Sequence, residues 1–222
     1  DIETNNMLAM VSRPHLNRKN PFGDRGVENR MLKQQIPGSV FKTVIAAAAI
    51  DYGLQPPSRN FNCDDNIYGK PDPNYQHGNL NFTESFARSC NRTFADLAKE
   101  LKDRDPRIIE EYAKKLSLTG SVGWEGPVYH TEQFRQLPDE EMGRVFKNED
   151  ARTDDNFVAL SAIGQHEVRV TPLAVANMMA TIARGGDKQM VRAVETVEYR
   201  NGTKVFGFDE KKLDGDNISP FT

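Results

Sequence analysis

The sequence predicts a mixed α/β fold of the α+β type, in which an antiparallel sheet packs on helices and a helical subdomain is inserted between its strands. Two observations predict this arrangement. Strand-like segments lie near both ends of the chain, and most segments between them have helical periodicity with helix caps. The length of 222 residues suffices for one large domain or two small ones, and no internal repeat is present.

The strand signals are clearest at the two ends. The apolar run Met7–Val11 predicts a buried strand that ends at Ser12-Arg13-Pro14. Near the other end, Val191–Tyr199 and Thr203–Phe208 flank Asn201-Gly202, a dipeptide typical of a tight hairpin turn. We therefore expect one strand near the start of the chain and a β-hairpin near its end.

The helical signals lie between these strands. Ser39–Tyr52 is the first predicted helix, because Pro37-Gly38 precedes it and Gly53 follows it. Its apolar residues nearly encircle the helix axis, so it should be buried. The other helices are expected at 83–88, at 93–102, from Asp105-Pro106 to near Gly120, at 157–163 and, after the cap Thr171-Pro172, at 173–184, with loops at 13–36 and 54–80 and an irregular stretch at 118–152.

The composition favours a globular protein and argues against a nucleic-acid partner. Charged residues make up 27% of the chain and apolar residues 37%, with a net charge of −3. Lysine and arginine are spread along the sequence and form no basic block of the kind that follows a phosphate backbone. No apolar run approaches the roughly 20 residues needed to span a bilayer. The chain starts with Asp1 instead of Met, which indicates a piece of a longer protein.

The cysteines and histidines give no sign of a metal or cofactor. Cys63 and Cys90 are expected to be two buried or unreactive thiols, because a disulfide scaffold would need more cysteines. The four histidines lie far apart without the spacing of metal ligands, and they are expected to be surface or structural residues. They are His15, His77, His130 and His166.

Ser39 and Lys42 are the first candidates for chemistry. Residues three apart share one face of a helix, so the Lys42 amine is expected beside the Ser39 hydroxyl. A serine becomes a nucleophile when a neighbouring base takes its proton, and burial lowers the pKa of a lysine so that it can be that base. The spacing alone is expected ~0.5 times by chance in a chain of this composition. The alternative is a helix-capping serine followed by an exposed lysine.

Ser89-Cys90-Asn91 is the second candidate. It lies between two predicted helices, where a loop can present a hydroxyl and an amide to a cleft. A second hydroxyl can relay a proton to a leaving amine, and an amide side chain can hold a peptide group. The same pattern at Ser58-Arg59-Asn60 is set aside, because it follows Pro56-Pro57 in a loop. The alternative is that Ser89 is an ordinary cap between helices.

Four segments, in the right order, resemble the transpeptidase domain of penicillin-binding proteins. Residues 37–42 (PGSVFK) look like the first active-site motif of that family, and Ser89-Cys90-Asn91 looks like the second. Residues 163–165, 170–173 and 176–186 resemble the segment before the third motif, and residues 7–14 resemble the strand that opens the domain. The Gly-Gln and Thr-Pro-Leu residues of the third segment favour the monofunctional class B enzymes.

Three departures from the family pattern stand out. The third motif, Lys-Thr-Gly or Lys-Ser-Gly, is absent, since 201–204 (NGTK) has similar letters in the wrong order. The family places that motif on a strand expected beyond Thr222, so we expect a domain truncated before it. His166 follows Gly164-Gln165 where the family usually has a small residue, and Asn5-Asn6 stands where Thr-Gly is common.

The resemblance implies a D,D-transpeptidase of peptidoglycan cross-linking that works through a serine acyl-enzyme and is acylated by β-lactams. Ser39 would attack the carbonyl between the last two D-alanines of a stem peptide, and Lys42 would take its proton. Ser89 would pass a proton to the departing D-alanine, and the Ser39 N–H would supply half of an oxyanion hole. The implied site residues are Ser39, Lys42 and Ser89 for catalysis and Asn91, Thr171 and Gln165 for substrate binding, with no cofactor and no metal.

The resemblance also implies the organisation and the partners. The whole chain, 1–222, would be a partial transpeptidase domain, with the active-site helix and helical subdomain in 13–155 and sheet-side elements in 1–12 and 156–222. Expected partners are peptidoglycan stem peptides, β-lactam antibiotics, a glycosyltransferase, and the membrane through an anchor absent from this chain. The expected location is the extracytoplasmic face of the bacterial cell membrane. Without the third motif the chain is expected to be weakly active or inactive.

Three alternatives stay open at the level of sequence. A serine β-lactamase shares the Ser-x-x-Lys nucleophile, but it needs a base that activates water, and no carboxylate stands in a recognisable position for that role. A β-lactam sensor or a non-catalytic scaffold for cell-wall synthesis would keep Ser39 without turnover. A helical binding module with accidental motifs would be indifferent to the loss of Ser39.

Overall fold

The structure, a computed structural model, describes residues 1–23 and 26–222 and divides the chain into two compact units. The hairpin unit comprises residues 1–35, 116–143 and 170–217, and the helical unit comprises residues 36–115, 144–169 and 218–222. Residues 24 and 25, which belong to the expected loop 13–36, lie outside the described residues.

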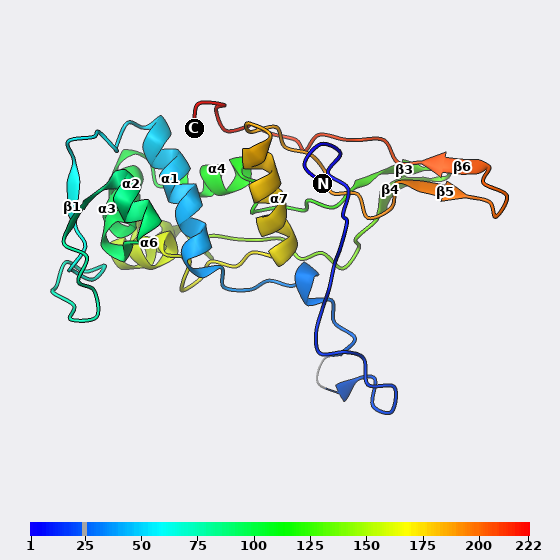
Figure 1. The fold of residues 1–222 in the computed structure, drawn as a ribbon, viewed down its shortest axis with the longest axis horizontal. Helices are drawn as coiled ribbons and strands as arrows, with labels where there is room; N and C mark the ends of the chain where they lie inside the picture. Colours follow the sequence, from blue (N-terminus) through cyan, green and yellow to red (C-terminus); the bar gives the residue numbers. More distant parts are fainter. Residues whose placement is uncertain (24–25) are drawn as a thin grey trace. The chain divides into compact units, whose positions relative to one another are not determined.

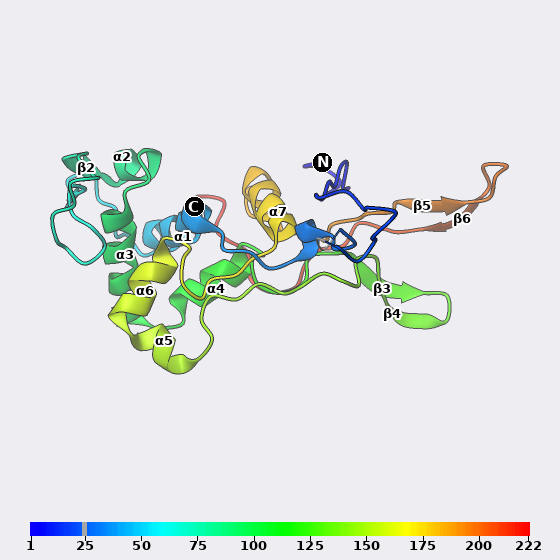
Figure 2. The same ribbon diagram turned by 90° about the horizontal axis from the view of Figure 1, so that it is seen from below.

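The helical unit is built around α1, which packs on α3 and α4, while α3 packs on α6 (Figure 1, Figure 2). Its core consists of fully buried side chains such as Phe41, Ile45 and Leu97. The elements of this unit are, in chain order, the 3₁₀ turn η3 (Gly38–Phe41), α1 (Lys42–Asp51), β1 (Asn60–Asn62), β2 (Asn79–Asn81), α2 (Phe82–Ala87), α3 (Asn91–Arg104), α4 (Ile108–Lys115), α5 (Glu149–Thr153) and α6 (Asp155–Ala162).

The helices of this unit lie near the predicted segments, with three differences: α5 falls mostly in the stretch expected to be irregular, α4 ends at Lys115 short of the expected end near Gly120, and the start of α2 is shifted. The apolar face of α3, formed by Phe94, Leu97, Ala98 and Leu101, is fully buried as expected. Helix α2 begins after Asn81 instead of at the expected Thr83. The Asn81 side chain accepts from the Glu84 N–H and the Glu84 carboxylate accepts from the Asn81 N–H, so a capping box satisfies both ends of the first turn.

The described residues of the hairpin unit form two antiparallel hairpins and one long helix. The hairpin predicted around Asn201-Gly202 is confirmed, with β5 paired to β6. Its Phe208 lies edge-on to Trp124 at 4.9 Å between ring centroids and stacks on Phe134 at 6.0 Å, so it is linked to the hairpin of β3 and β4. The elements of this unit are η2 (Arg30–Leu32), β3 (Glu125–Val128), β4 (Thr131–Arg135), α7 (Pro172–Ala183), β5 (Thr196–Glu198) and β6 (Lys204–Gly207).

The predicted mixture of helices and antiparallel strands is confirmed, but the described strands form three separate two-stranded ladders instead of one sheet. The pairs β1–β2 and β3–β4 were not expected. Their strands contain residue types that are depleted in strands, namely four asparagines in β1 and β2 and Gly126-Pro127 in β3. Between the ladders of the hairpin unit, Val191 donates to the Val122 carbonyl at 2.7 Å and Met7 donates to the Arg192 carbonyl at 2.8 Å.

The prediction of a buried strand at Met7–Val11 is wrong. Only Met7 at its start joins the backbone of Arg192, and the segment has no strand assignment. Leu8 is 78% exposed and Val11 is 67% exposed. An apolar run becomes a strand only where a neighbouring backbone pairs with it and a further layer covers it, and among the described residues that pairing ends at Met7.

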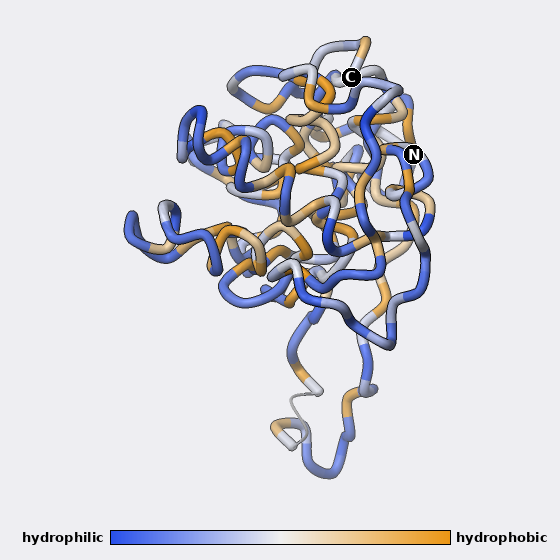
Figure 3. Tube along the Cα trace, turned by 90° about the vertical axis from the view of Figure 1, so that its left-hand side faces the viewer, coloured by the Kyte–Doolittle hydropathy of each residue, from blue (hydrophilic) through white to orange (hydrophobic). Residues whose placement is uncertain are grey.

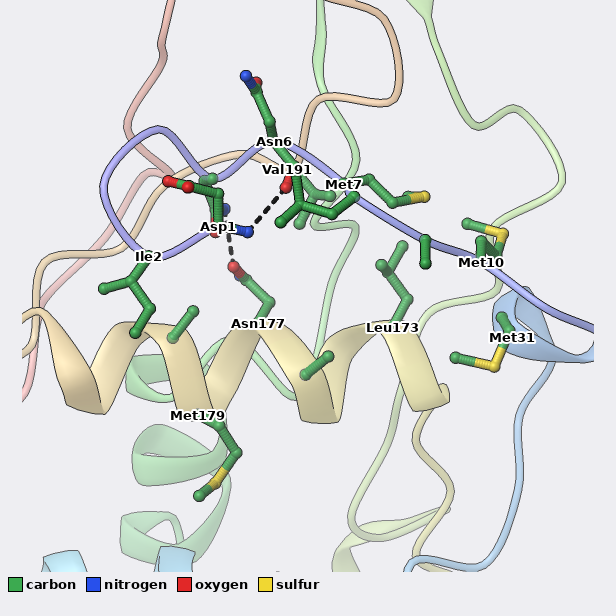
Figure 4. A pocket seen from close by; sticks show the side chains of 15 residues that line it. Asp1, Ile2, Asn6, Met7, Met10, Met31, Leu173, Asn177, Met179 and Val191 are labelled. Atoms are coloured by element: carbon green, nitrogen blue, oxygen red, sulfur yellow. Dashed lines mark hydrogen bonds between the residues drawn. The ribbon is translucent and has the colours of Figure 1, made fainter.

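An apolar cavity of about 460 Å³ lies in the hairpin unit between this segment and α7. Figure 4 shows Met7 and Met10 on one wall and Leu173 and Met179 on the helix opposite. At its base, the Asn5 side chain donates to the Asn177 side chain at 2.9 Å. A polar contact therefore holds the chain just before Met7–Val11, beside the apolar side chains of this segment that line the cavity.

No helix in the described part of the chain is both long and apolar enough to cross a membrane. In Figure 3 the trace alternates between short hydrophilic and hydrophobic stretches.

Candidate active site

Ser39 and Lys42 meet at the start of the first helix, where the sequence placed them. Ser39 lies in the 3₁₀ turn η3 and Lys42 is the first residue of α1. Side chains three apart eclipse each other in a 3₁₀ turn, and the Lys42 Nζ lies 3.2 Å from the Ser39 Oγ. Lys42 is only 2% exposed, whereas Ser39 is exposed. The hydroxyl is therefore open to an incoming molecule while the amine behind it is buried.

Ser89 and Asn91 reach the same amine from the turn between α2 and α3. The Lys42 Nζ donates to the Ser89 Oγ at 2.9 Å, to the Ser89 carbonyl oxygen at 2.6 Å and to the Asn91 Oδ1 at 2.6 Å. The structure thus brings four of the six candidate residues together around one nitrogen atom. Alone, each of the two motifs was compatible with a simple capping role.

The four oxygen partners of Lys42 differ in what they can do. The Asn91 Oδ1 and the Ser89 carbonyl oxygen only accept hydrogen bonds, and they are also the nearest, so they take N–H protons in either protonation state. The two hydroxyls can accept or donate. A neutral amine has two protons and one lone pair, so its lone pair faces the hydroxyls of Ser39 and Ser89. This arrangement can move a proton between these two hydroxyls through Lys42.

Burial lowers the pKa of the Lys42 amine to about 8 from its usual 10.5. The side chain is enclosed by the alanine-rich α1 and by the buried Phe94, whose ring centroid lies 5.7 Å from the Nζ. At pH 7 about a tenth of such side chains are neutral. The site therefore holds a usable population of free base near neutral pH.

Ser89 has a backbone conformation that L-residues rarely adopt, with φ +56°. The Cys90 N–H donates to the Ser85 carbonyl and the Ser89 N–H donates to the Phe86 carbonyl, which is the Schellman pattern at the end of α2. The left-handed position of that motif is usually glycine. A serine at this position has a strained backbone, which lowers the local stability. The same conformation directs its hydroxyl and its carbonyl toward Lys42.

The turn before Ser39 is held by a contact between two glycine backbones. The Gly38 N–H donates to the Gly164 carbonyl at 2.9 Å. A Cβ atom on Gly164 would stand 1.9 Å from the Gly38 carbonyl oxygen. Both glycines have positive φ angles, +60° for Gly38 and +69° for Gly164. The segment after α6 therefore packs directly on the turn that presents Ser39, a role that the sequence did not reveal.

The expectation of two free thiols is wrong, because Cys63 and Cys90 form a disulfide. Both are buried, as expected, and their Cα atoms are 5.8 Å apart. Counting cysteines argues against a disulfide scaffold but not against a single bridge. The bridge attaches the start of the loop after β1 to the residue between Ser89 and Asn91.

Tyr75 is a further member of the cluster that the sequence analysis missed. The Asn91 Nδ2 donates to the Tyr75 hydroxyl at 3.2 Å. Tyr75 lies in the loop between β1 and β2, among prolines, asparagines and aspartates, and belongs to no motif. No local sequence signal could have found it, because the contact depends on how this loop folds back toward α3.

The structure does not add Thr171 and Gln165 to the cluster around Lys42. Thr171 belongs to the hairpin unit, where its buried hydroxyl accepts from the Ala174 N–H and caps α7, as Thr171-Pro172 predicted. Gln165 is exposed in the helical unit, and its N–H donates to the Leu160 carbonyl. Their substrate-binding roles stay predictions.

The histidines lie on the surface, and His166 packs on the Phe157 ring at 4.6 Å between centroids. Within residues 1–23 and 26–222 no group of three or more histidine, cysteine, aspartate or glutamate side chains could hold a metal ion.

Comparison with known proteins gives one family match over the whole chain. The family described as penicillin binding protein transpeptidase domain matches residues 1–222. The curated peptidoglycan D,D-transpeptidase PbpA of Mycobacterium tuberculosis is 25% identical over 241 residues, which cover 94% of this chain and 45% of that protein. The chain thus spans less than half the length of this curated relative.

Two solved structures have the same fold. The penicillin G acyl-enzyme complex of penicillin-binding protein A from M. tuberculosis matches with a TM-score of 0.68 at 21% identity, over 92% of this chain and 44% of that one. PBP2 of Pseudomonas aeruginosa, in complex with WCK 5153, matches with a TM-score of 0.72 at 22% identity, over 99% of this chain and 52% of that one. Both proteins belong to the class B group that the sequence favoured.

The glycine contact predicts a large difference between two alanine substitutions. Gly164→Ala should lower the free energy of unfolding by about 2 kcal/mol more than Gly53→Ala does, because the new methyl group overlaps the Gly38 backbone. Gly53 is the matched control, since its φ of +66° is nearly that of Gly164 and nothing lies within 4 Å of its Cβ position. Urea unfolding followed by circular dichroism measures the difference, and equal values would contradict the contact.

The conformation of Ser89 predicts that Ser89→Gly is more stable than Ser89→Ala by about 1 kcal/mol. Both variants lack the hydroxyl, so their difference isolates the cost of a Cβ atom at positive φ. Thermal and urea unfolding of the two variants measure it. Equal stability would mean that Ser89 does not occupy the left-handed position in solution.

Proposed function

The chain belongs to the penicillin-binding protein transpeptidase family, and from this premise we propose that it carries the serine acyl-transfer centre of a peptidoglycan D,D-transpeptidase. The observation that carries the proposal is the buried Lys42 amine, which faces the hydroxyls of Ser39 and Ser89 and the amide of Asn91. The similarity to PbpA supports the reaction class. Because the chain spans less than half of that relative, activity of the whole protein is part of the proposal.

Acylation would begin with the exposed Ser39 hydroxyl, whose proton passes to the lone pair of neutral Lys42. The Ser39 Oγ forms a bond to the carbonyl carbon between the two terminal D-alanines of a stem peptide. Collapse of the tetrahedral intermediate breaks the C–N bond, and the proton reaches the departing amine from Lys42 through Ser89, which lies 2.9 Å from the Nζ. The products are a Ser39 ester and free D-alanine.

The second half would transfer the acyl group to an amine of a neighbouring stem peptide. That amine attacks the ester carbonyl, Ser89 and Lys42 accept its proton, and the Ser39 Oγ leaves and is reprotonated. The Ser39 N–H lies in the first turn of a helix, where N–H groups have no partner within the helix, so it can face the developing oxyanion. Asn91 would bind the peptide amide of the substrate through its own amide group.

The cluster favours transpeptidation over β-lactam hydrolysis. Among the described residues, the Lys42 Nζ donates to hydroxyl, amide and carbonyl oxygens. A hydrolase needs a base that activates water against the ester, and a carboxylate usually fills that role in serine β-lactamases. A long-lived acyl-enzyme is therefore expected, which also makes β-lactams the inhibitors of such a site.

The location and partners follow from this chemistry. Stem peptides lie outside the cytoplasmic membrane, and the disulfide between Cys63 and Cys90 supports an oxidising compartment. We place the domain at the extracytoplasmic face of the bacterial cell membrane, attached through an anchor in another part of the protein. Cross-linking consumes polymerised glycan strands, so a glycosyltransferase is the expected enzymatic partner.

Acylation of Ser39 is expected to rise with pH, with a midpoint of about 8, because only neutral Lys42 can accept the proton. The pKa of this lysine is lower in the folded chain than in the unfolded chain. Unfolding therefore takes up a proton between about pH 8 and 10.5, and this group makes folding more favourable as pH rises across that window. Acylation rates from pH 6 to 9.5 and NMR titration of the Lys42 side chain measure both effects. A titration midpoint near 10.5 would contradict the proposed base.

The central experiment is labelling of residues 1–222 with a fluorescent penicillin, followed by intact mass and peptide mapping. We expect one adduct, on Ser39, that forms slowly. The chain has no Lys-Thr-Gly or Lys-Ser-Gly motif, and in the family the strand with this motif supplies the second half of the oxyanion hole. Loss of one oxyanion donor lowers the rate about 10²–10³-fold in comparable sites. Rapid stoichiometric labelling would contradict the expected rate. Labelling that persists in Ser39→Ala would overturn the function.

A further inference from the structure

The loop between β1 and β2 is fixed at its base and attached to the second motif. The Cys63 N–H donates to the Gly78 carbonyl at 2.9 Å, and the Gly78 N–H donates to the Asp64 Oδ1 at 2.8 Å, so the two ends of the loop are joined. The disulfide then links Cys63 to Cys90. Inside the loop, the Tyr75 N–H donates to the Asp72 carbonyl at 3.0 Å. Tyr75 is therefore presented from a closed loop that cannot separate far from Ser89 and Asn91.

The orientation of the Asn91 amide follows from its two partners. The Lys42 Nζ donates to the amide oxygen at 2.6 Å, so this oxygen faces Lys42. The amide nitrogen then points the other way, where the Tyr75 hydroxyl accepts from it at 3.2 Å. The Tyr75 hydroxyl is thus connected to the Lys42 amine by two hydrogen bonds that both involve the Asn91 amide.

We propose that Tyr75 is a positioning residue for the acyl-donor peptide, because its hydroxyl fixes the Asn91 amide with one N–H toward Tyr75 and the second N–H free for a substrate carbonyl. This inference rests on the proposed function. It assigns to the loop between β1 and β2 a part in binding the amide of the substrate backbone, beside the two motifs already described.

The hydrogen-bond capacity of the amide makes this arrangement useful. The Asn91 Nδ2 carries two protons, and Tyr75 takes one of them. Without Tyr75 the amide could rotate about its last torsion and present its oxygen to a substrate carbonyl, which it would repel. Fixing the amide before binding removes that wrong orientation and its entropic cost. The tyrosine hydroxyl also keeps its own proton, which can donate to water or to the substrate.

Tyr75→Phe is the direct test, with fluorescent penicillin as the acylating probe on the chain as it exists. Loss of the hydroxyl should lower the acylation efficiency about three- to tenfold, which corresponds to the net contribution of one hydrogen bond. The loss should come from weaker binding before acylation, with a nearly unchanged maximal rate, because the amide holds the substrate and does not transfer the proton. The concentration dependence of labelling separates these two parameters.

Tyr68→Phe is the matched control, because Tyr68 lies in the same loop and is exposed. It should leave the efficiency unchanged. A purely structural role for Tyr75 is tested by NMR of the Asn91 side-chain amide in the unliganded chain. Its two proton signals should shift in Tyr75→Phe and stay in place in Tyr68→Phe.

The outcomes separate this proposal from the proposed function. Unchanged Asn91 amide signals in Tyr75→Phe would overturn the positioning role whether or not the chain is acylated. A higher acylation efficiency would also overturn it, because Tyr75 would then compete with substrate for the amide. Labelling that does not depend on Ser39 would overturn the function itself, and the amide signals would still decide whether Tyr75 orients Asn91.

Discussion

The site depends on the burial of one amine. An ionisable group taken out of water is costly unless polar partners surround it, and Lys42 is almost fully buried. The oxygen atoms that satisfy it come from the turn before α1 and from the turn between α2 and α3. The same burial that demands these partners also lowers the pKa of the amine. Enclosure and basicity are therefore two consequences of one arrangement, and the positions of Ser39, Ser89 and Asn91 follow from it.

The unusual backbone of this region follows from the same requirement. Gly38 and Ser89 both have positive φ, and Gly164 packs on the backbone of Gly38 with no room for a side chain. Glycine meets such a demand without cost, whereas serine does not. At Ser89 the hydroxyl and the carbonyl both bond Lys42, so a glycine could supply only one of the two contacts. At Ser89 a side chain and a strained backbone are needed together, which lowers local stability.

The sequence predicted the features that depend on residues close together in the chain. The spacing of Ser39 and Lys42, the amphipathic face of α3 and the cap at Thr171 each involve residues within one or two helical turns. The sequence missed what depends on distant segments. Tyr75 and the Cys63–Cys90 bridge come from a loop without periodicity, and the failed strand at Met7–Val11 lacked a partner that no local pattern can supply. The two active-site motifs, at 37–42 and at Ser89-Cys90-Asn91, were assigned to one site by the family resemblance. Their separation along the sequence did not predict that they meet.

The residues between the motif positions determine how the motifs point. In the first motif, Phe41 is completely buried and Val40 is exposed, so the turn is held by its phenyl ring while Ser39 stays open. In the second, Cys90 is buried, bonded to Cys63, and its sulfur accepts from the Thr93 N–H at the start of α3. Each motif therefore combines an outward reactive side chain with an inward anchor. A substitution at such an anchor would change the direction of the reactive groups without changing their identity, so the function of the motif is carried by its buried residue as well as by its polar ones.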